Sequence, residues 1–362
     1  MRSRARSTAL ILAVLTAGCG NDAPTAPTPT SPGTLVAALL SCPPSVERQS
    51  VDALPVTVSW DLPTVAGIPV DKSSCSPVSG SAFPIGTSTV TCTPDQTTLA
   101  SSCSFSITIT PPAPTLRFTR FMAFGDSITA GEVGGSFLPP GVTARALLAR
   151  LRAAHGRPLP GISNAVQPLT AYPAQLHNLL TPAYATQQIS VANEGLSGER
   201  AAQGVLRLTA SLLAGQPEVL MLFEGFNDID VAFLNRPAGD DTPISVAPIA
   251  ADLRTMVRNA QGRGVEVLLA TLTPVTDARE ESDPGTRAAI LALNTEIRSM
   301  ATALGLGGVV DLYAALDGVP GVIGADGFHP TVTGYRRMAE LFFAEIVSRY
   351  DITPRAPALT AP

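Results

Sequence analysis

An apolar run turns directly into a polar loop near residue 120 of this chain. The run and the loop read Phe121-Met122-Ala123-Phe124-Gly125-Asp126-Ser127-Ile128-Thr129-Ala130-Gly131. Consecutive apolar residues that stop at a glycine and an aspartate are typical of a buried β-strand followed by a turn. Ser127 therefore lies where this strand ends.

Further apolar runs follow and alternate with stretches of helical periodicity. We expect strands over residues 189–192, 219–223, 265–271 and 308–312, and helices over residues 172–180, 200–214, 248–262, 285–304 and 332–349. This alternation predicts an α/β fold, with a parallel sheet covered by helices on both faces. Sites in open parallel sheets form at the carboxyl ends of the strands, which is where Ser127 lies.

Three other polar segments occur at strand or helix boundaries. They are Asn193-Glu194-Gly195-Leu196-Ser197-Gly198-Glu199 and Gly225-Phe226-Asn227-Asp228, each after a predicted strand, and Asp326-Gly327-Phe328-His329-Pro330, before the last predicted helix. Any one of them could be ordinary loop chemistry, and a lone Gly-Asp-Ser is more often a turn with a helix cap. The presence of all four in this order makes a catalytic arrangement the better interpretation.

The four segments in order resemble the SGNH, or GDSL, hydrolase family over about residues 117–350. The resemblance implies a flavodoxin-like three-layer α/β/α fold with esterase or lipase activity. It also implies a catalytic triad of Ser127, His329 and Asp326. The implied oxyanion hole consists of the backbone N–H groups of Ser127 and Gly198 and the side-chain amide of Asn227.

These residue types suit ester hydrolysis. A serine hydroxyl becomes a strong nucleophile only when a neighbouring base takes its proton, and the usual histidine pKa of about 6.5 suits that exchange. In the implied triad the Asp326 carboxylate fixes the imidazole tautomer, and preorganised donors stabilise the oxyanion. We expect neither a metal nor an organic cofactor, because the chain has three histidines and a single lysine.

Several other polar residues have simpler interpretations. We expect Asp126 and Asp228 to organise loops by accepting hydrogen bonds from backbone amides, and residues 277–283 to form a solvated loop. The long segment 132–171 after the proposed nucleophile is compatible equally with a lid and with a packed surface insertion.

The first residues resemble a bacterial lipoprotein signal. Three arginines precede an uncharged, mostly apolar stretch too short for an ordinary membrane span, and Leu15-Thr16-Ala17-Gly18-Cys19 closes it. The resemblance to a lipobox implies cleavage after residue 18 and a lipid on Cys19. The alternative is an ordinary secretory signal with an incidental cysteine. Residues 19–35, rich in proline and threonine, are expected to be an extended tether.

Short alternating runs of Ser, Thr and Val over residues 36–111 predict antiparallel strands. The other four cysteines lie here, at Cys42, Cys75, Cys92 and Cys103, and imply two disulfides with three possible connectivities. Motifs such as Cys42-Pro43-Pro44 and Val58-Ser59-Trp60 make the segment resemble a hyalin repeat (HYR) module, which implies a small immunoglobulin-like β-sandwich. With that resemblance we favour Cys42–Cys103 and Cys75–Cys92, and we expect Trp60 in the core.

The remaining boundaries follow from composition. Residues 112–116 are expected to be a stiff linker, 117–350 the hydrolase domain, and 351–362 a disordered tail. The net charge of −5 argues against a nucleic-acid partner.

The sequence as a whole predicts an exported, membrane-anchored bacterial serine esterase. Its substrate would be a small-molecule, lipid or acetylated-glycan ester. An acyltransferase with the same acyl-enzyme, and a surface adhesion or carbohydrate-binding protein with a vestigial hydrolase domain, are the alternatives. Neither the acyl group, the alcohol nor the oligomeric state follows from the sequence.

The lipid anchor has a direct test. Cys19→Ser removes the thiol that would be acylated, so we expect the protein to leave the membrane fraction and to lose metabolic labelling by radioactive palmitate. Asn21→Ser, just beyond the lipobox, should leave both properties unchanged. Labelling that survives in Cys19→Ser would show that Cys19 is not the modified residue.

Overall fold

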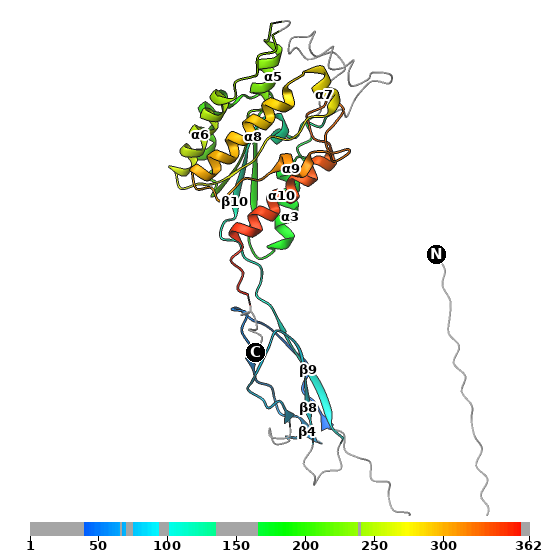
Figure 1. Cartoon of the computed structure of the whole chain (residues 1–362). Coiled ribbons are helices and arrows are strands. Elements are labelled where there is room, and N and C mark those ends of the chain that lie inside the picture. The colour runs from blue at the N-terminus through cyan, green and yellow to red at the C-terminus, as the bar shows by residue number, and fades with distance from the viewer. Residues whose placement is uncertain are drawn as a thin grey trace, which may run out of the picture. The chain divides into compact units, whose positions relative to one another are not determined.

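A computed structural model describes residues 40–65, 67–69, 75–93, 101–134, 166–237 and 240–355 (Figure 1). The predictions for the signal segment, Cys19 and the tether lie outside the described residues. So do those for residues 135–165, which make up most of the suggested lid, and for residues 356–362.

A four-stranded parallel sheet forms the centre of the larger domain. Its strand order is β11-β10-β12-β13, with β10 and β12 adjacent in the middle. The strands are β10 (Arg120–Gly125), β11 (Ser190–Gly195), β12 (Val219–Phe223) and β13 (Glu266–Leu269). Because the chain first adds a strand on one side of β10 and then continues on the other, the order reverses at β10, and ligand sites in such sheets form at that point.

The predicted fifth strand at residues 308–312 is almost absent. Within the part of the chain that the structure describes, it pairs through a single parallel bridge between Ala270 and Val310. Glycines at 305, 307 and 308 adopt positive φ angles just before it. Asp311 then caps the next helix by accepting a hydrogen bond from the Ala314 N–H, so the chain leaves the sheet after one bridge.

Helices cover the sheet in two groups. α3 packs against α10, and α4, α6 and α8 pack in succession (Figure 1). These helices are α3 (Tyr172–Ala183), α4 (Ala201–Gly215), α6 (Ala247–Gln261), α8 (Thr286–Ala303) and α10 (Val332–Tyr350). Right-handed crossovers place the two groups on opposite faces of the sheet, which is the expected three-layer α/β arrangement.

The amino-acid sequence of the strands fits a sheet that helices cover on both faces. All five residues of β12 are buried, as expected for a parallel strand covered on both faces. In β10, Met122 and Phe124 lie against glycines of α4, and the alternate residues face the other layer. In the described ranges, four shorter helices connect these elements: α1 (Ser127–Ala130), α5 (Phe226–Leu234), α7 (Asp277–Ser282) and α9 (Leu312–Leu316).

The N-terminal region is a separate β-rich module. It contains a four-stranded sheet in the order β2-β9-β8-β6, a three-stranded sheet in the order β1-β4-β5, and the pair β3-β7. The strands are β1 (Leu40–Ser41), β2 (Val46–Gln49), β3 (Val56–Val58), β4 (Thr64–Val65), β5 (Ile68–Pro69), β6 (Cys75–Ser76), β7 (Ser81–Phe83), β8 (Gly86–Cys92) and β9 (Cys103–Thr110).

Two disulfides join these strands. Cys42 is bonded to Cys103 and Cys75 to Cys92, which is the connectivity that we favoured. Trp60 is half-buried and meets the buried Phe105 edge-on, with ring centroids 5.3 Å apart. Its predicted place in the core of the module is therefore only partly correct.

The ends of the hydrolase domain differ from expectation. Residues 351–353 were expected to begin a disordered tail, and residues 115–116 to belong to a linker. Instead the two segments pair: Leu116 forms a bridge with Asp351, and the Ile352 N–H donates to the Thr115 carbonyl at 2.9 Å. Leu116 is also buried in the core, which extends the folded domain on both sides.

The structure describes no helix with both the length and the apolar character needed to cross a membrane.

Asn294 of α8 provides a test of the core. Its fully buried amide accepts from the Leu272 N–H at 2.7 Å and donates to the Leu272 carbonyl at 3.1 Å, which fixes the chain just beyond β13. Asn294→Ala leaves both groups unpaired, so we expect a loss of about 2–5 kcal/mol in the free energy of unfolding by urea. The exposed neighbour variant Thr295→Ala should change it by less than about 0.5 kcal/mol. Equal losses in the two variants would contradict this role of Asn294.

Candidate active site

The turn after β10 presents Ser127 at the carboxyl edge of the sheet. Ser127 is the first residue of α1, and the Asp126 side chain caps this short helix by accepting from the Ile128 N–H at 2.9 Å. Gly195, at the end of β11, packs against the same helix so closely that a Cβ would lie 2.1 Å from the Ala130 nitrogen. Close backbone packing explains why a glycine stands here.

The loop before α10 presents Asp326 and His329. Asp326 Oδ1 accepts hydrogen bonds from the backbone N–H groups of Phe328 and His329, at 3.2 and 3.1 Å. The loop is closed by the Gly324 N–H, which donates to the His329 carbonyl at 2.8 Å. The three-residue spacing thus turns both side chains toward the same side.

A chain of hydrogen bonds joins the two loops. Ser127 Oγ lies 2.8 Å from His329 Nε2, and His329 Nδ1 lies 2.7 Å from Asp326 Oδ2. All three residues are buried, with 5%, 3% and 1% of their surfaces exposed for Ser127, His329 and Asp326. Burial by itself lowers the pKa of His329, but the hydrogen bond to Asp326 and nearby carboxylates outweigh it and raise the pKa above 6.5.

The two other predicted residues lie on the loops that follow β11 and β12. Gly198 has a φ of +77°, and a Cβ there would meet no atom within 4 Å. The positive φ, rather than crowding, therefore requires glycine at this position. Asn227 lies in the first turn of α5, and its amide donates to the Glu199 carbonyl at 2.9 Å, which leaves its second N–H for another acceptor.

Buried polar contacts fix the loop that carries Gly198. Arg207 of α4 donates to Glu199 Oε1 at 2.8 Å and to the Glu194 carbonyl at 2.9 Å. Its guanidinium also lies over the Phe124 ring, 3.9 Å from the centroid. Asp228 accepts from the Ala201 N–H at 2.8 Å, which joins the start of α5 to the start of α4. The loop-organising roles expected of Asp126 and Asp228 are confirmed.

Residues 277–283 do not form the solvated loop that we expected. Thr276 caps the helix α7 there, and the side chain of Arg279 is buried, at 8% exposure, between Asp230 and Asp283. The Arg279 guanidinium lies over the ring of Phe328, next to His329. A short helix whose arginine is paired with Asp230 and Asp283 thus packs against the loop that presents His329.

Two buried carboxyl groups lie near Ser127. Complete burial raises the pKa of Asp126 to about 7, although the hydrogen bond from Ile128 and the nearby His329 lower it. Burial and the neighbouring Asp126 likewise raise the pKa of Glu224 well above its usual value. Within the described residues, Asp126 Oδ2 and both Glu224 oxygens have no hydrogen-bond partner. The protonated forms are therefore favoured here.

Sequence reasoning missed Glu132. Its carboxylate oxygen Oε2 lies 3.4 Å from His329 Nε2, and its side chain is 16% exposed. Glu132 directly follows the Gly125–Gly131 segment. Its closeness to Ser127 in the sequence is the feature that could have pointed to it. No group of three or more His, Cys, Asp or Glu side chains is placed to hold a metal ion in the described ranges.

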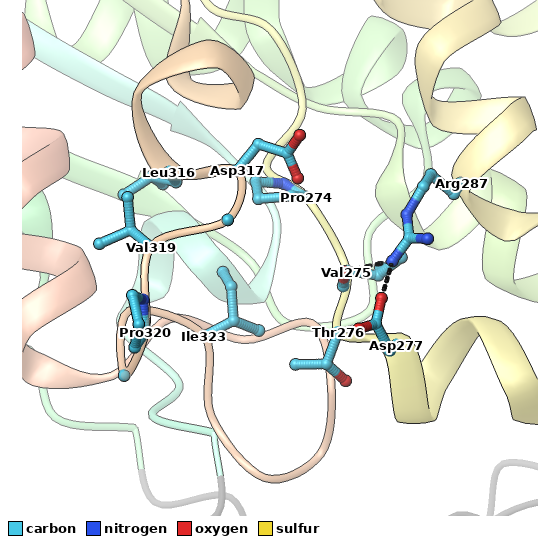
Figure 2. Close-up of a pocket in the computed structure, with 12 residues that line it drawn as sticks. Pro274, Val275, Thr276, Asp277, Arg287, Leu316, Asp317, Val319, Pro320 and Ile323 are labelled. Carbon is cyan, nitrogen blue, oxygen red and sulfur yellow. Dashed lines mark hydrogen bonds and ion pairs between the residues drawn. The ribbon is translucent and has the colours of Figure 1, made fainter.

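A cavity of about 470 Å³ lies on another side of the loop that carries His329. Figure 2 shows Arg287 and Asp277 at one end of it, 2.7 Å apart, and the apolar side chains of Leu316, Val319 and Ile323 opposite. Neither Ser127 nor His329 lines this cavity. Its wall nevertheless supports the loop of His329, because the Thr276 N–H donates to the Gly327 carbonyl at 3.0 Å.

Comparison with protein families found two matches. The model of the GDSL-like lipase/acylhydrolase family matches residues 123–337, and the model of the HYR domain matches residues 38–109. No curated protein matches the chain in sequence.

Solved structures with similar folds include three hydrolases. A lipase/acylhydrolase from Enterococcus faecalis is 26% identical, with 66% of this chain and 100% of that chain covered and a TM-score of 0.46. A carbohydrate acetylesterase from Sinorhizobium meliloti is 15% identical, with 64% and 99% covered and a TM-score of 0.46. A GDSL-like lipase from Bacteroides thetaiotaomicron is 19% identical, with 64% and 88% covered and a TM-score of 0.41.

The burial of Asp126 predicts that the free energy of unfolding depends on pH. Its pKa of about 7 in the folded protein exceeds the ordinary value of 3.8, so between these values only the unfolded chain gives up the proton and stability falls as the pH rises. Asp126→Asn keeps the capping oxygen but does not titrate. Relative to the wild type, we expect its free energy of unfolding to rise by up to about 4 kcal/mol between pH 4 and 8, since one pKa unit corresponds to about 1.4 kcal/mol.

The control is Thr295→Ala, at an exposed position whose side chain does not titrate, so its difference from the wild type should stay constant with pH. Urea unfolding at intervals across this range measures both. An Asp126→Asn difference that is also constant would contradict the buried, protonated carboxyl.

Proposed function

The chain belongs to the GDSL-like lipase/acylhydrolase family, and on this premise we propose that it is a serine esterase that hydrolyses carboxylic esters through an acyl-Ser127 intermediate. One observation carries the proposal. The Ser127 hydroxyl, the His329 ring and the Asp326 carboxylate form a buried, continuous chain of hydrogen bonds of 2.8 and 2.7 Å. This is the geometry that activates a serine nucleophile.

In the first half of the proposed reaction, Ser127 Oγ attacks the ester carbonyl carbon while its proton passes to His329 Nε2. The resulting imidazolium is stabilised by Asp326, which accepts the hydrogen bond from Nδ1. Collapse of the tetrahedral intermediate breaks the bond to the alcohol oxygen, which takes the proton from Nε2. The products of this half are the free alcohol and the acylated serine.

The negative oxygen of the intermediate needs donors that are already in place. We assign this role to the backbone N–H groups of Ser127 and Gly198 and to the Asn227 amide. In the described part of the chain neither backbone N–H donates to a backbone carbonyl or a side chain, and the Asn227 amide keeps one N–H beyond its bond to Glu199. Each donor of this kind typically contributes about 10²–10³-fold to kcat.

In the second half, water replaces the alcohol. His329 takes a proton from the water, which attacks the acyl carbon, and then returns a proton to Ser127 Oγ as the carboxylic acid leaves. Both halves begin with neutral His329. Because its pKa is raised above 6.5, activity should fall as the pH decreases through that raised value.

The location and the substrate complete the proposal. We propose export through the N-terminal signal, attachment by a lipid on Cys19, the 19–35 tether, and a disulfide-bonded HYR module that holds the hydrolase domain away from the membrane. Disulfides persist in the oxidising compartments outside the cytosol, which supports export. The proposed substrates are small-molecule, lipid or acetylated-glycan esters.

Hydrolysis of p-nitrophenyl esters, from acetyl to palmitoyl, tests the activity. Purified full-length protein should release p-nitrophenol, and Ser127→Ala should lower kcat by about 10⁴-fold or more because no nucleophile remains. Ser299→Ala, on the exposed side of α8, is the matched serine control and should retain the wild-type rate.

Two results would count against the proposal. A Ser127→Ala protein that stays folded and active would refute the nucleophile, and absence of wild-type activity across the panel would argue against a general esterase. If p-nitrophenol is released but the acyl group is recovered on an added alcohol rather than as free acid, the protein is an acyltransferase.

A further inference from the structure

We propose that Glu132 is a positioning residue of the site. Its carboxylate stabilises the positively charged form of the His329 ring on the side that exchanges the proton, and it thereby sets the lowest pH at which the enzyme works. The catalytic part of this inference rests on the proposed esterase function. The electrostatic part rests on the structure alone.

The position of the Glu132 carboxylate is the first observation. Nε2 of His329 is the nitrogen that exchanges a proton with Ser127 Oγ, at 2.8 Å, and Glu132 Oε2 lies 3.4 Å from the same nitrogen. Asp326 contacts the opposite nitrogen, Nδ1. The ring therefore lies between two carboxylates, and among the described residues Glu132 is the carboxylate beside the nitrogen from which the proton moves.

The backbone holds Glu132 in this position independently of its side chain. The Glu132 N–H donates to the Ser127 carbonyl at 2.9 Å, and the Tyr335 hydroxyl of α10 donates to the Glu132 carbonyl at 2.6 Å. Two residues on, the Gly134 N–H donates to the Pro330 carbonyl at 3.2 Å. The segment is thus tied both to the nucleophile turn and to the loop of His329. An uncharged glutamine would occupy the same place.

Burial makes this charge effective. The side chains of His329 and Glu132 are 4% and 16% exposed, so water screens their interaction much less than it screens a surface pair. An anion beside Nε2 favours the imidazolium over the neutral ring. Proton transfer from Ser127 to His329 becomes easier, but the resting histidine is also protonated at a higher pH.

The other groups that face the ring do not provide the same effect. Asp326 belongs to the loop of His329 itself and acts on Nδ1. Asp126, on the nucleophile turn, has a pKa of about 7 and so carries only part of a charge near neutrality. Tyr335 on α10 is a neutral phenol, and Arg279 on α7 lies over the neighbouring Phe328 ring. Among the described residues, Glu132 is therefore the charge whose removal should act on the Nε2 side of the ring.

The test compares Glu132→Gln with the wild type in the full-length protein. The first measurement is an NMR titration of the His329 ring after ¹³C labelling of histidine, with the signal assigned by its loss in His329→Gln. The second is the pH dependence of kcat/KM for a p-nitrophenyl ester, whose acid limb reports the free enzyme. Glu296→Gln, exposed on α8, makes the same change in net charge and serves as the control.

We expect the His329 titration and the acid limb of kcat/KM to move together to lower pH in Glu132→Gln. Below the wild-type limb, the variant should retain a larger fraction of its plateau activity than the wild type retains. Neither midpoint should move in Glu296→Gln. A purely structural role would lower the plateau without moving either midpoint.

The outcomes separate this inference from the esterase proposal. A His329 titration that is unchanged in Glu132→Gln overturns the electrostatic role, whatever the activity. A titration that moves while the acid limb stays fixed overturns the catalytic role. If the wild-type protein hydrolyses no ester, the esterase proposal and the catalytic role fail together, and the NMR titration still decides whether Glu132 acts on the ring.

Discussion

The hydrogen bond between the Ser127 hydroxyl and the His329 ring joins residues 202 positions apart in the sequence. It forms only if the end of β10 and the loop before α10 meet at one edge of the sheet. The parallel register of the four strands brings the loops that follow them to that edge, and α10 packs against α3 on one face of the sheet. The geometry of the site is therefore a consequence of the topology, which places it where the strand order reverses.

Several titratable side chains lie buried around the site. Some are paired, as Arg207 is with Glu199 and Arg279 with Asp283, and these pairs hold the loops that carry Gly198 and His329. Others, such as Asp126 and Glu224, are favoured in their protonated forms because burial opposes their ionisation. Against this background, the ionisation of His329 depends on the few carboxylates that reach its two nitrogens.

Local pattern was sufficient to predict four strands, the principal helices, and the segments that carry Ser127, Gly198, Asn227 and His329. It was insufficient where distant contacts decide the structure. The run 308–312 has strand-like residues, but positive-φ glycines and the Asp311 cap limit it to one bridge. Residues 277–283 have the composition of a solvated loop, but they form a helix that packs on the domain because Arg279 contacts Asp230 and Phe328. The approach of Glu132 to His329 depends on tertiary contacts between segments far apart in the sequence, so the residues around Glu132 do not predict it.

The most direct test of the central claim is whether Ser127 alone is activated. A fluorophosphonate reacts with serine hydroxyls only where a base removes their proton, and the adduct is located by mass spectrometry of peptides. We expect one adduct, on Ser127, that forms in the full-length wild-type protein and is lost in a folded His329→Gln variant. An adduct on another serine, or labelling of Ser127 that survives the loss of His329, would contradict it.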